Sequence, residues 1–109
     1  MTAPLTDHSL SRTGRIAQAI LDGSTTLLAG ARQIAQLAIA HSAALDEDFA
    51  PFVIFDDRTF DLPTAEARQH WAADALTKKD AQLAAIDSEL RPEALAACRR
   101  LVARFGSDR

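Results

Sequence analysis

DEDFAPFVIFDDRTFDLP, residues 46 to 63, lies between two long alanine-rich stretches and holds four of the chain's five phenylalanines and six of its fifteen acidic residues. Its short apolar run PFVIF is compatible with a strand or a helix, because a run of this length has no distinctive periodicity. We favour a short helix or turn over 48–60. Asp48 can cap such a helix, and Pro51 then falls in the first turn, where its missing N–H costs nothing.

The segment must hide its rings while its carboxylates stay hydrated, so we expect either a plug for the core or a contact surface. In a helix, Phe49, Phe52 and Phe55 are three residues apart and share one side. If these rings are in the core, each change to alanine should cost about 3 to 5 kcal/mol. If they form an interface, the monomer should survive while association weakens.

The sequences on both sides of this segment predict helices, because apolar residues repeat there at spacings of three and four. The expected ranges are 11–22, 25–45, 65–90 and 92–105. Gly23 is the natural stop of the first helix, and Pro92 is expected to kink the chain or restart the helix. Since no convincing second strand pattern is present, the predicted fold class is all-α, a compact bundle of four to five helices.

The chain length of 109 residues fits one domain. We expect a single helical domain over 11–106, with flexible tails at 1–10 and 107–109. An apolar fraction of 48% and a charged fraction of 25% are typical of globular domains. No stretch approaches the roughly 18 apolar residues of a membrane span, and the start MTAPLTDHSLSRTGR has no basic region followed by an apolar run. A cytoplasmic protein without membrane contact is therefore expected.

Charge is distributed unevenly along the chain. Residues 46 to 66 carry seven acidic residues against Arg58, a net charge of −6, whereas residues 91 to 109 carry five arginines against Glu93 and Asp108, a net charge of +3. We expect these opposite patches to face each other, either within one fold or across a dimer. A nucleic-acid ligand is not expected, because a chain of net charge −3 offers little surface to neutralise phosphates.

Candidate chemistry is sparse. Asp56, Asp57 and Asp61 are close enough in sequence to suggest a cation site, with His41 or His70 as a nitrogen ligand, but the twelve-residue frame of an EF-hand is absent. We therefore interpret the carboxylates as solvated, and we expect no metal, cofactor or catalytic residue. The lone Trp71 favours core or interface over ligand stacking. The single cysteine, Cys98, lies on an apolar helical face and is expected to be buried.

The order of elements resembles a family of small bacterial helical proteins of unknown function, over roughly residues 15 to 103. The resemblance is carried by an ILDG turn, GARQIAQL, DFAPFVIFDDRTFDLP, RQHWAADALTKKDAQL and AACRRLV. It implies a helical fold and no activity. Where members tend to have an acidic residue and a histidine before LP, this chain has Phe60 and Asp61, and where members often have a proline shortly after the tryptophan, it has Ala73. The second departure weakens the helix break that the family implies near residues 72 to 73, so both a continuous helix from residue 65 and a break at this place stay open.

These observations predict a structural or protein-interaction module that self-associates as a homodimer or binds a protein partner, and that is not an enzyme. Two alternatives stay open: a small-ligand or metal-binding enzyme that uses residues 56–61, and an antitoxin-like or immunity-like protein that binds a basic partner through its acidic segment. The candidate interaction or site residues are Phe49, Phe52, Phe55, Asp56, Asp57, Phe60, Asp61, His70 and Trp71.

Overall fold

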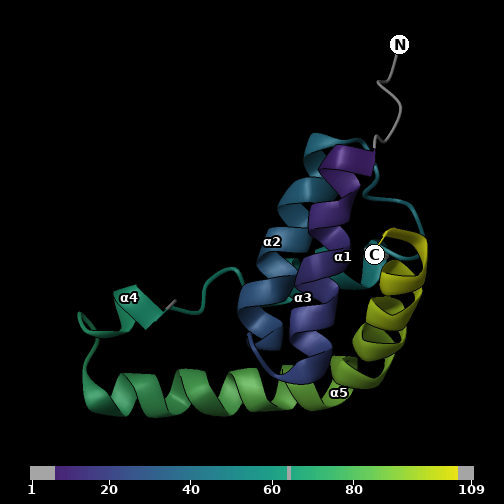
Figure 1. The fold of residues 1–109 in the computed structure, drawn as a ribbon. Helices are drawn as coiled ribbons and strands as arrows, with labels where there is room; N and C mark the ends of the chain where they lie inside the picture. The colour runs from purple at the N-terminus through teal and green to yellow at the C-terminus, as the bar shows by residue number, and fades with distance from the viewer. Residues whose placement is uncertain (1–6, 64, 106–109) are drawn as a thin grey trace.

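The computed structural model describes residues 7–63 and 65–105. It confirms the predicted all-α class, and no strand occurs within these residues. The helices are α1 (Asp7–Asp22), α2 (Leu27–Ala40), α3 (Ala50–Thr59), α4 (Ala65–Arg68) and α5 (Ala73–Phe105). In Figure 1, α1 and α2 stand side by side, whereas α5 runs along the base of the molecule and then turns upward beside α1.

The four longer helices form a closed ring around one core. Helix α1 packs against α2 and α5, and α3 completes the ring by packing against α2 and α5 as well. The buried apolar side chains come from all four helices and from the segment between α2 and α3, so a single core holds the bundle together. Its members are Ile16, Ala17, Ile20, Leu27, Ala31, Ile34, Ala38, Ala43, Phe49, Phe52, Phe55, Ile86, Ala94, Ala97, Cys98 and Leu101.

Two glycines set the α1–α2 hairpin. Gly23 has φ of +84° and follows directly after α1, as its position in the sequence predicts. Gly30 lies so close to α1 that a Cβ built on it would come within 2.5 Å of two side-chain carbons of Ile20. The cap of α2 is Thr26, whose hydroxyl accepts a hydrogen bond from the Ala29 amide at 3.0 Å.

The ends of these two helices differ from the predicted ranges. Helix α1 begins at Asp7, four residues before the expected start, so the expected tail over residues 1–10 is helical in its last four positions. Helix α2 ends at Ala40 instead of continuing to residue 45. There Ser42 adopts a left-handed φ of 56°, and the Ala43 amide donates to the Ala38 carbonyl at 2.7 Å. This pattern is a Schellman motif with serine at the position that glycine usually occupies, which explains why no glycine marks the end in the sequence.

The phenylalanine-rich segment is a helix, as predicted. Pro51 lies in the first turn of α3. The predicted cap is wrong, however, because Phe49 occupies the N-cap position without a side-chain hydrogen bond, and the carboxylate of Asp48 binds two arginines instead.

The prediction of one continuous helix over residues 65–90 is also wrong. Four residues form α4, the chain turns over residues 69–72, and α5 starts at Ala73. The guanidinium of Arg68 donates to both carboxylate oxygens of Asp80, at 2.6 and 3.0 Å. In a continuous helix these residues would be about 18 Å apart along the axis, so the ion pair requires the chain to fold back. Thr64, a residue type suited to the N-cap of a helix that starts at residue 65, lies outside the described residues.

Pro92 lies inside α5 without ending it. Figure 1 shows that α5 bends in the part of the helix that contains this residue, where its colour passes from green to yellow. A proline removes one backbone hydrogen bond and crowds the preceding turn, which accounts for a bend at this place. The predicted kink is therefore confirmed, and a restart as a separate helix is not observed.

The part of α5 before the bend projects from the bundle. Together with α4 it forms an arm, which we define as residues 65–85 (Figure 1). The radius of gyration is 14.5 Å, compared with about 13 Å for a compact domain of this length. Within the described residues, no helix has the length and apolar character needed to cross a membrane.

Candidate interaction surface

The phenylalanines at the first three candidate positions belong to the core. Phe49, Phe52 and Phe55 are all fully buried, whereas Phe60, just after α3, is 76% exposed. The ring of Phe49 also lies 6.2 Å from that of Phe105, between ring centroids. The segment is therefore mainly a plug for the core, and only its last ring is available to a partner.

The carboxylates of this segment do not form a common site. Asp56 is half-buried and lies 3.7 Å from the Arg32 guanidinium, whereas Asp61 accepts a hydrogen bond from the Lys79 ammonium at 3.1 Å. Asp57 is exposed and makes no ion pair with a described residue. His70 lies at the tip of the arm, after α4. Across the described chain, no three His, Cys, Asp or Glu side chains are placed to hold one metal ion. Among the described residues, these carboxylates and His70 are therefore not gathered at one metal site.

Arg32 has a structural role that the sequence reasoning missed. Its Nη2 donates to the carbonyl oxygens of Thr59 at 2.6 Å and Leu62 at 3.0 Å, and so it satisfies backbone acceptors at the C-terminal end of α3. The available signal was a lone arginine in an otherwise apolar helix. Such a residue needs buried acceptors to compensate for the loss of water, and helix ends are where free carbonyl groups occur.

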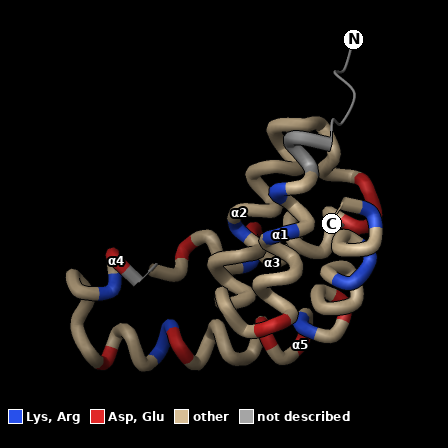
Figure 2. Tube along the Cα trace, viewed as in Figure 1, with Lys and Arg blue, Asp and Glu red and all other residues tan. Residues whose placement is uncertain are grey.

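The acidic and basic patches predicted from the sequence meet within one fold. Asp48 accepts from Arg100 at 2.5 Å and from Arg104 at 2.9 Å, and Arg104 also binds Asp46 at 3.0 Å. Figure 2 shows these acidic residues beside the basic C-terminal end of α5. Burial raises the pKa of Asp48, but hydrogen bonds and charges from the two arginines outweigh this effect and lower the pKa overall. Much of the acidic segment is therefore neutralised internally, which weakens the case for a basic partner.

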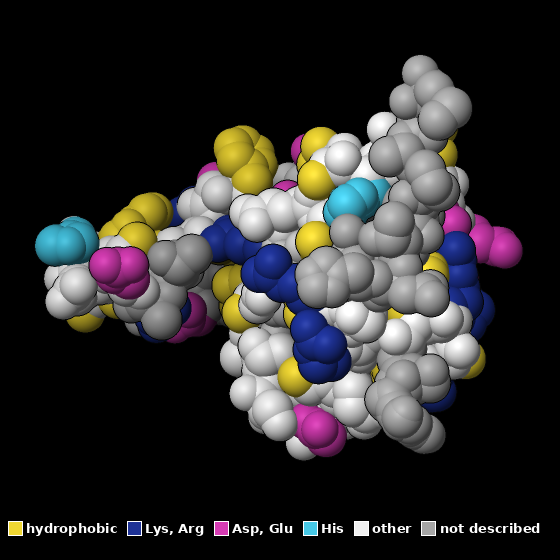
Figure 3. Space-filling view, turned by 45° about the horizontal axis from the view of Figure 1, so that its top comes forward, with side chains coloured by type: hydrophobic (Ala, Val, Ile, Leu, Met, Phe, Trp, Pro, Cys, Tyr) yellow, Lys and Arg dark blue, Asp and Glu magenta, His cyan; other side chains and the backbone are white. Residues whose placement is uncertain are grey.

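One ion pair joins the arm to the body, between Lys79 of α5 and Asp61. A second ion pair, between Arg68 of α4 and Asp80 of α5, joins the two helices of the arm to each other. Leu83 of the arm is partly buried and packs against the core. Trp71, which is 37% exposed, has its ring centroid 5.8 Å from the Lys79 ammonium. In Figure 3, the arm projects from the rounded body, and exposed hydrophobic side chains lie on it and where it leaves the body.

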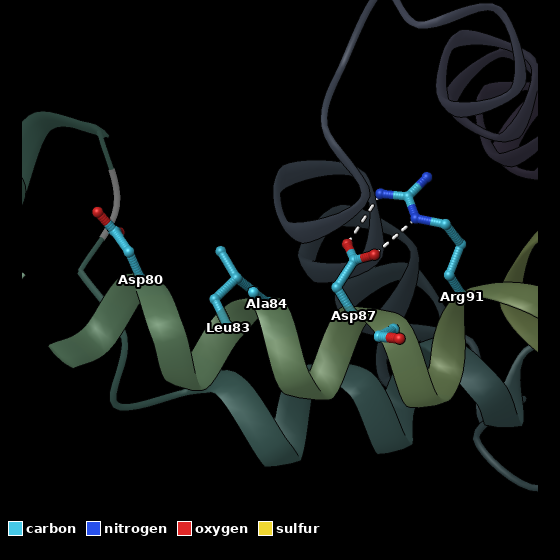
Figure 4. Close-up of a pocket in the computed structure, with 6 residues that line it drawn as sticks. Asp80, Leu83, Ala84, Asp87 and Arg91 are labelled. Atoms are coloured by element: carbon cyan, nitrogen blue, oxygen red, sulfur yellow. Dashed lines mark hydrogen bonds and ion pairs between the residues drawn. The ribbon is translucent and has the colours of Figure 1, made fainter. Parts of the chain in front are cut away.

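Two hollows adjoin the arm. The larger one, of about 670 Å³, is open and lies along α5, and Figure 4 shows its lining residues on one side of that helix. These residues are Asp80, Leu83, Ala84, Asp87, Ser88 and Arg91. The smaller hollow, of about 170 Å³, lies between arm and body. Its lining residues are Thr26, Leu28, Leu62, Pro63, Arg68, Lys79, Asp80 and Leu83.

The acids that line the larger hollow are already paired within the chain. Asp87 binds Nε and Nη2 of Arg91 at 2.6 and 2.8 Å (Figure 4). Asp80 binds Arg68. Asp87 and Arg91 thus pair at the i, i+4 spacing of a helix, whereas Asp74 and Lys78, at the same spacing, form no ion pair among the described residues. The hollow is therefore a mixed surface of alanine, leucine and neutralised charge rather than an acidic cation site.

Cys98 is fully buried, as expected. Burial raises the pKa of its thiol to about 11, so the thiolate that a nucleophile needs is scarce at neutral pH.

Comparison of the chain with protein-family models, with curated proteins and with solved structures gives no match. The resemblance noted in the sequence therefore remains a prediction.

Proposed function

We propose that this protein is a protein-interaction module rather than an enzyme, and that it binds its partner through the arm. The proposal depends on the observation that the first part of α5 lies almost entirely outside the core. Residues 73–85 form about three and a half helical turns, yet the first α5 side chain in the core is Ile86. This stretch of helix therefore adds a long exposed surface and no fully buried side chain.

The helix of the arm would be only marginally stable without the rest of the protein. A helix of 12 to 15 residues is only marginally stable in water, so this stretch depends on its continuity with the part of α5 that packs in the bundle. Its two ion pairs are exposed, and such pairs contribute only about 0 to 1 kcal/mol each. A straight, exposed helix of this kind is well suited to recognition by a groove or by a second helix.

Side-chain chemistry points in the same direction. Asp56 and Asp61 are engaged by cations of the same chain, and Cys98 is buried at the centre of the fold. The acidic segment serves packing and charge pairing, whereas residues 73–85 of the arm place no side chain in the buried core.

Position-specific photo-crosslinking would test this function. A photoreactive amino acid is placed at Ala84, which is exposed on the arm side of α5, and in a matched control at Ala103, which is exposed on the same helix beyond the bend. In cells that express the chain, the variant with the probe at residue 84 should give a discrete adduct, identified by mass spectrometry, that the control does not give. Equal adducts at both positions, or none from residue 84, would reject the arm as the binding element.

A further inference from the structure

The outward side of α5 carries a row of exposed residues whose chemistry is the same when read in either direction. They are Asp74, Thr77, Ala81, Ala84, Ser88 and Arg91, and all six are exposed. Their spacing alternates between three and four residues, so they lie along one seam of the helix. From either end, the order is a charged residue, a hydroxyl and an alanine, and the two end charges are opposite in sign.

This symmetry identifies a partner. We propose that the arm, together with the part of α5 that continues to Arg91, binds a second copy of this chain, with the two α5 helices antiparallel and a two-fold axis passing between Ala81 and Ala84. This inference rests on the proposed function of the arm and names its partner. In the antiparallel arrangement, Asp74 faces Arg91 of the second copy at both ends of the seam. A parallel arrangement would instead place Asp74 against Asp74 and Arg91 against Arg91.

The charged groups at the two ends are available for these contacts. Asp74 makes no ion pair or hydrogen bond with its side chain in the described part of the chain, although a lysine lies four residues away. Arg91 uses Nε and Nη2 to bind Asp87, and its third nitrogen, Nη1, points away from that carboxylate (Figure 4). An arginine can bind two carboxylates in this way, because its guanidinium carries five N–H donors.

The centre of the seam permits close approach. Ala81 of one copy lies opposite Ala84 of the other, and Thr77 lies opposite Ser88, so no large side chain separates the two backbones. Asp80 and Asp87 flank the seam, and each is already neutralised by an arginine of its own chain. The seam spans 18 residues, or about 27 Å, which gives a contact smaller than a standard interface. We expect reversible, salt-sensitive association in the micromolar range.

Sedimentation of the purified full-length chain over a concentration series provides the first test. The mass should rise from 11.8 kDa towards twice that value, and added salt should shift the equilibrium back towards the monomer. Asp74→Arg and Arg91→Asp should each weaken association at least tenfold, because each places like charges opposite one another. The double variant D74R/R91D should restore it, although it still lacks the Asp87 ion pair within the chain.

Orientation is tested by disulfide trapping. Thr77→Cys and Ser88→Cys should form a disulfide when the two variants are mixed, and neither should form one alone; the native Cys98 is buried and does not interfere. A parallel pair would instead crosslink each variant to itself, and that result would overturn the inference.

A matched control uses the same change on the same helix. Ala84→Arg should abolish association, whereas Ala103→Arg beyond the bend should leave it intact. A native chain that stays monomeric at every concentration would overturn the second copy as partner. The proposed function would then still be judged by crosslinking from residue 84, where an adduct with a different protein supports the arm and counts against self-association.

Discussion

Phe52→Ala tests the assignment of the phenylalanine-rich helix to the core. The Phe52 side chain is fully buried, and its position in α3 places it in the single apolar cluster that all four longer helices share. Truncation removes a ring and leaves a cavity that a ring of four helices can close only in part. We expect a loss of about 3 to 5 kcal/mol in the free energy of unfolding, measured by urea titration and followed by circular dichroism.

The magnitude is large compared with the whole stability of such a domain, which is typically about 5 to 15 kcal/mol. The midpoint of thermal unfolding should therefore fall by more than about 12 °C. Phe60→Ala provides the matched control, because this phenylalanine is 76% exposed and its loss should change stability by less than about 1 kcal/mol. Equal effects of the two changes, or a loss below about 1.5 kcal/mol for Phe52→Ala, would show that the segment does not plug the core.

Three further changes probe buried polar groups. The hydroxyl of Thr13 is buried and has no hydrogen-bond partner in the described part of the chain, so Thr13→Val should stabilise the protein by about 1 kcal/mol in urea unfolding. Thr59→Val should destabilise it by about 1 kcal/mol, because it removes the hydrogen bond that the Thr59 hydroxyl donates to the Phe55 carbonyl. The pKa of Asp48 is lower in the folded protein than its unfolded value of about 3.8, so its contribution to stability is complete above pH 3.8 and is lost as the pH falls through the folded pKa. When the free energy of unfolding is measured from pH 6 to pH 2, the Asp48→Asn variant should therefore lose less stability than the native protein. Cys98 is buried and its pKa is raised to about 11, so it should react with a thiol reagent at pH 8 only as fast as the protein unfolds. In the control variant Ser88→Cys, the added cysteine is at an exposed position and should react at once.

Sequence periodicity predicted the bundle well because its helices are defined by local patterns. Gly23 ends α1, Pro51 begins α3 and Pro92 bends α5, and in each case the backbone preference of one residue decides the geometry. The end of α2 was missed because Ser42 takes the left-handed position at which glycine is the usual signal. Local backbone preferences predict the most common helix end, which has glycine in the left-handed position, whereas α2 ends with a serine there.

The arm was missed for a different reason. Residues 65–90 contain neither glycine nor proline, and every local signal favours one straight helix. The break at residues 69–72 brings together residues that would be far apart on such a helix, such as Arg68 and Asp80, and a local pattern carries no signal of that contact. The Asp48 network has the same character, because its arginines follow it by 52 and 56 residues. Charge asymmetry along the sequence predicted that opposite patches would meet, but only the fold shows which residues pair.

The energetics of the arm connect its structure with its proposed partner. Its helix is continuous with the packed part of α5, so the covalent connection positions it, while exposed ion pairs stabilise its orientation only weakly. A second copy placed along the seam would add contacts to a row of side chains that are exposed in the single chain. Because the bundle already presents this helix in its bound conformation, association would not have to supply the free energy of ordering it. A seam made mostly of alanine and hydroxyl side chains can then suffice for a weak, reversible dimer, in which the charges of Asp74 and Arg91 set the direction of pairing.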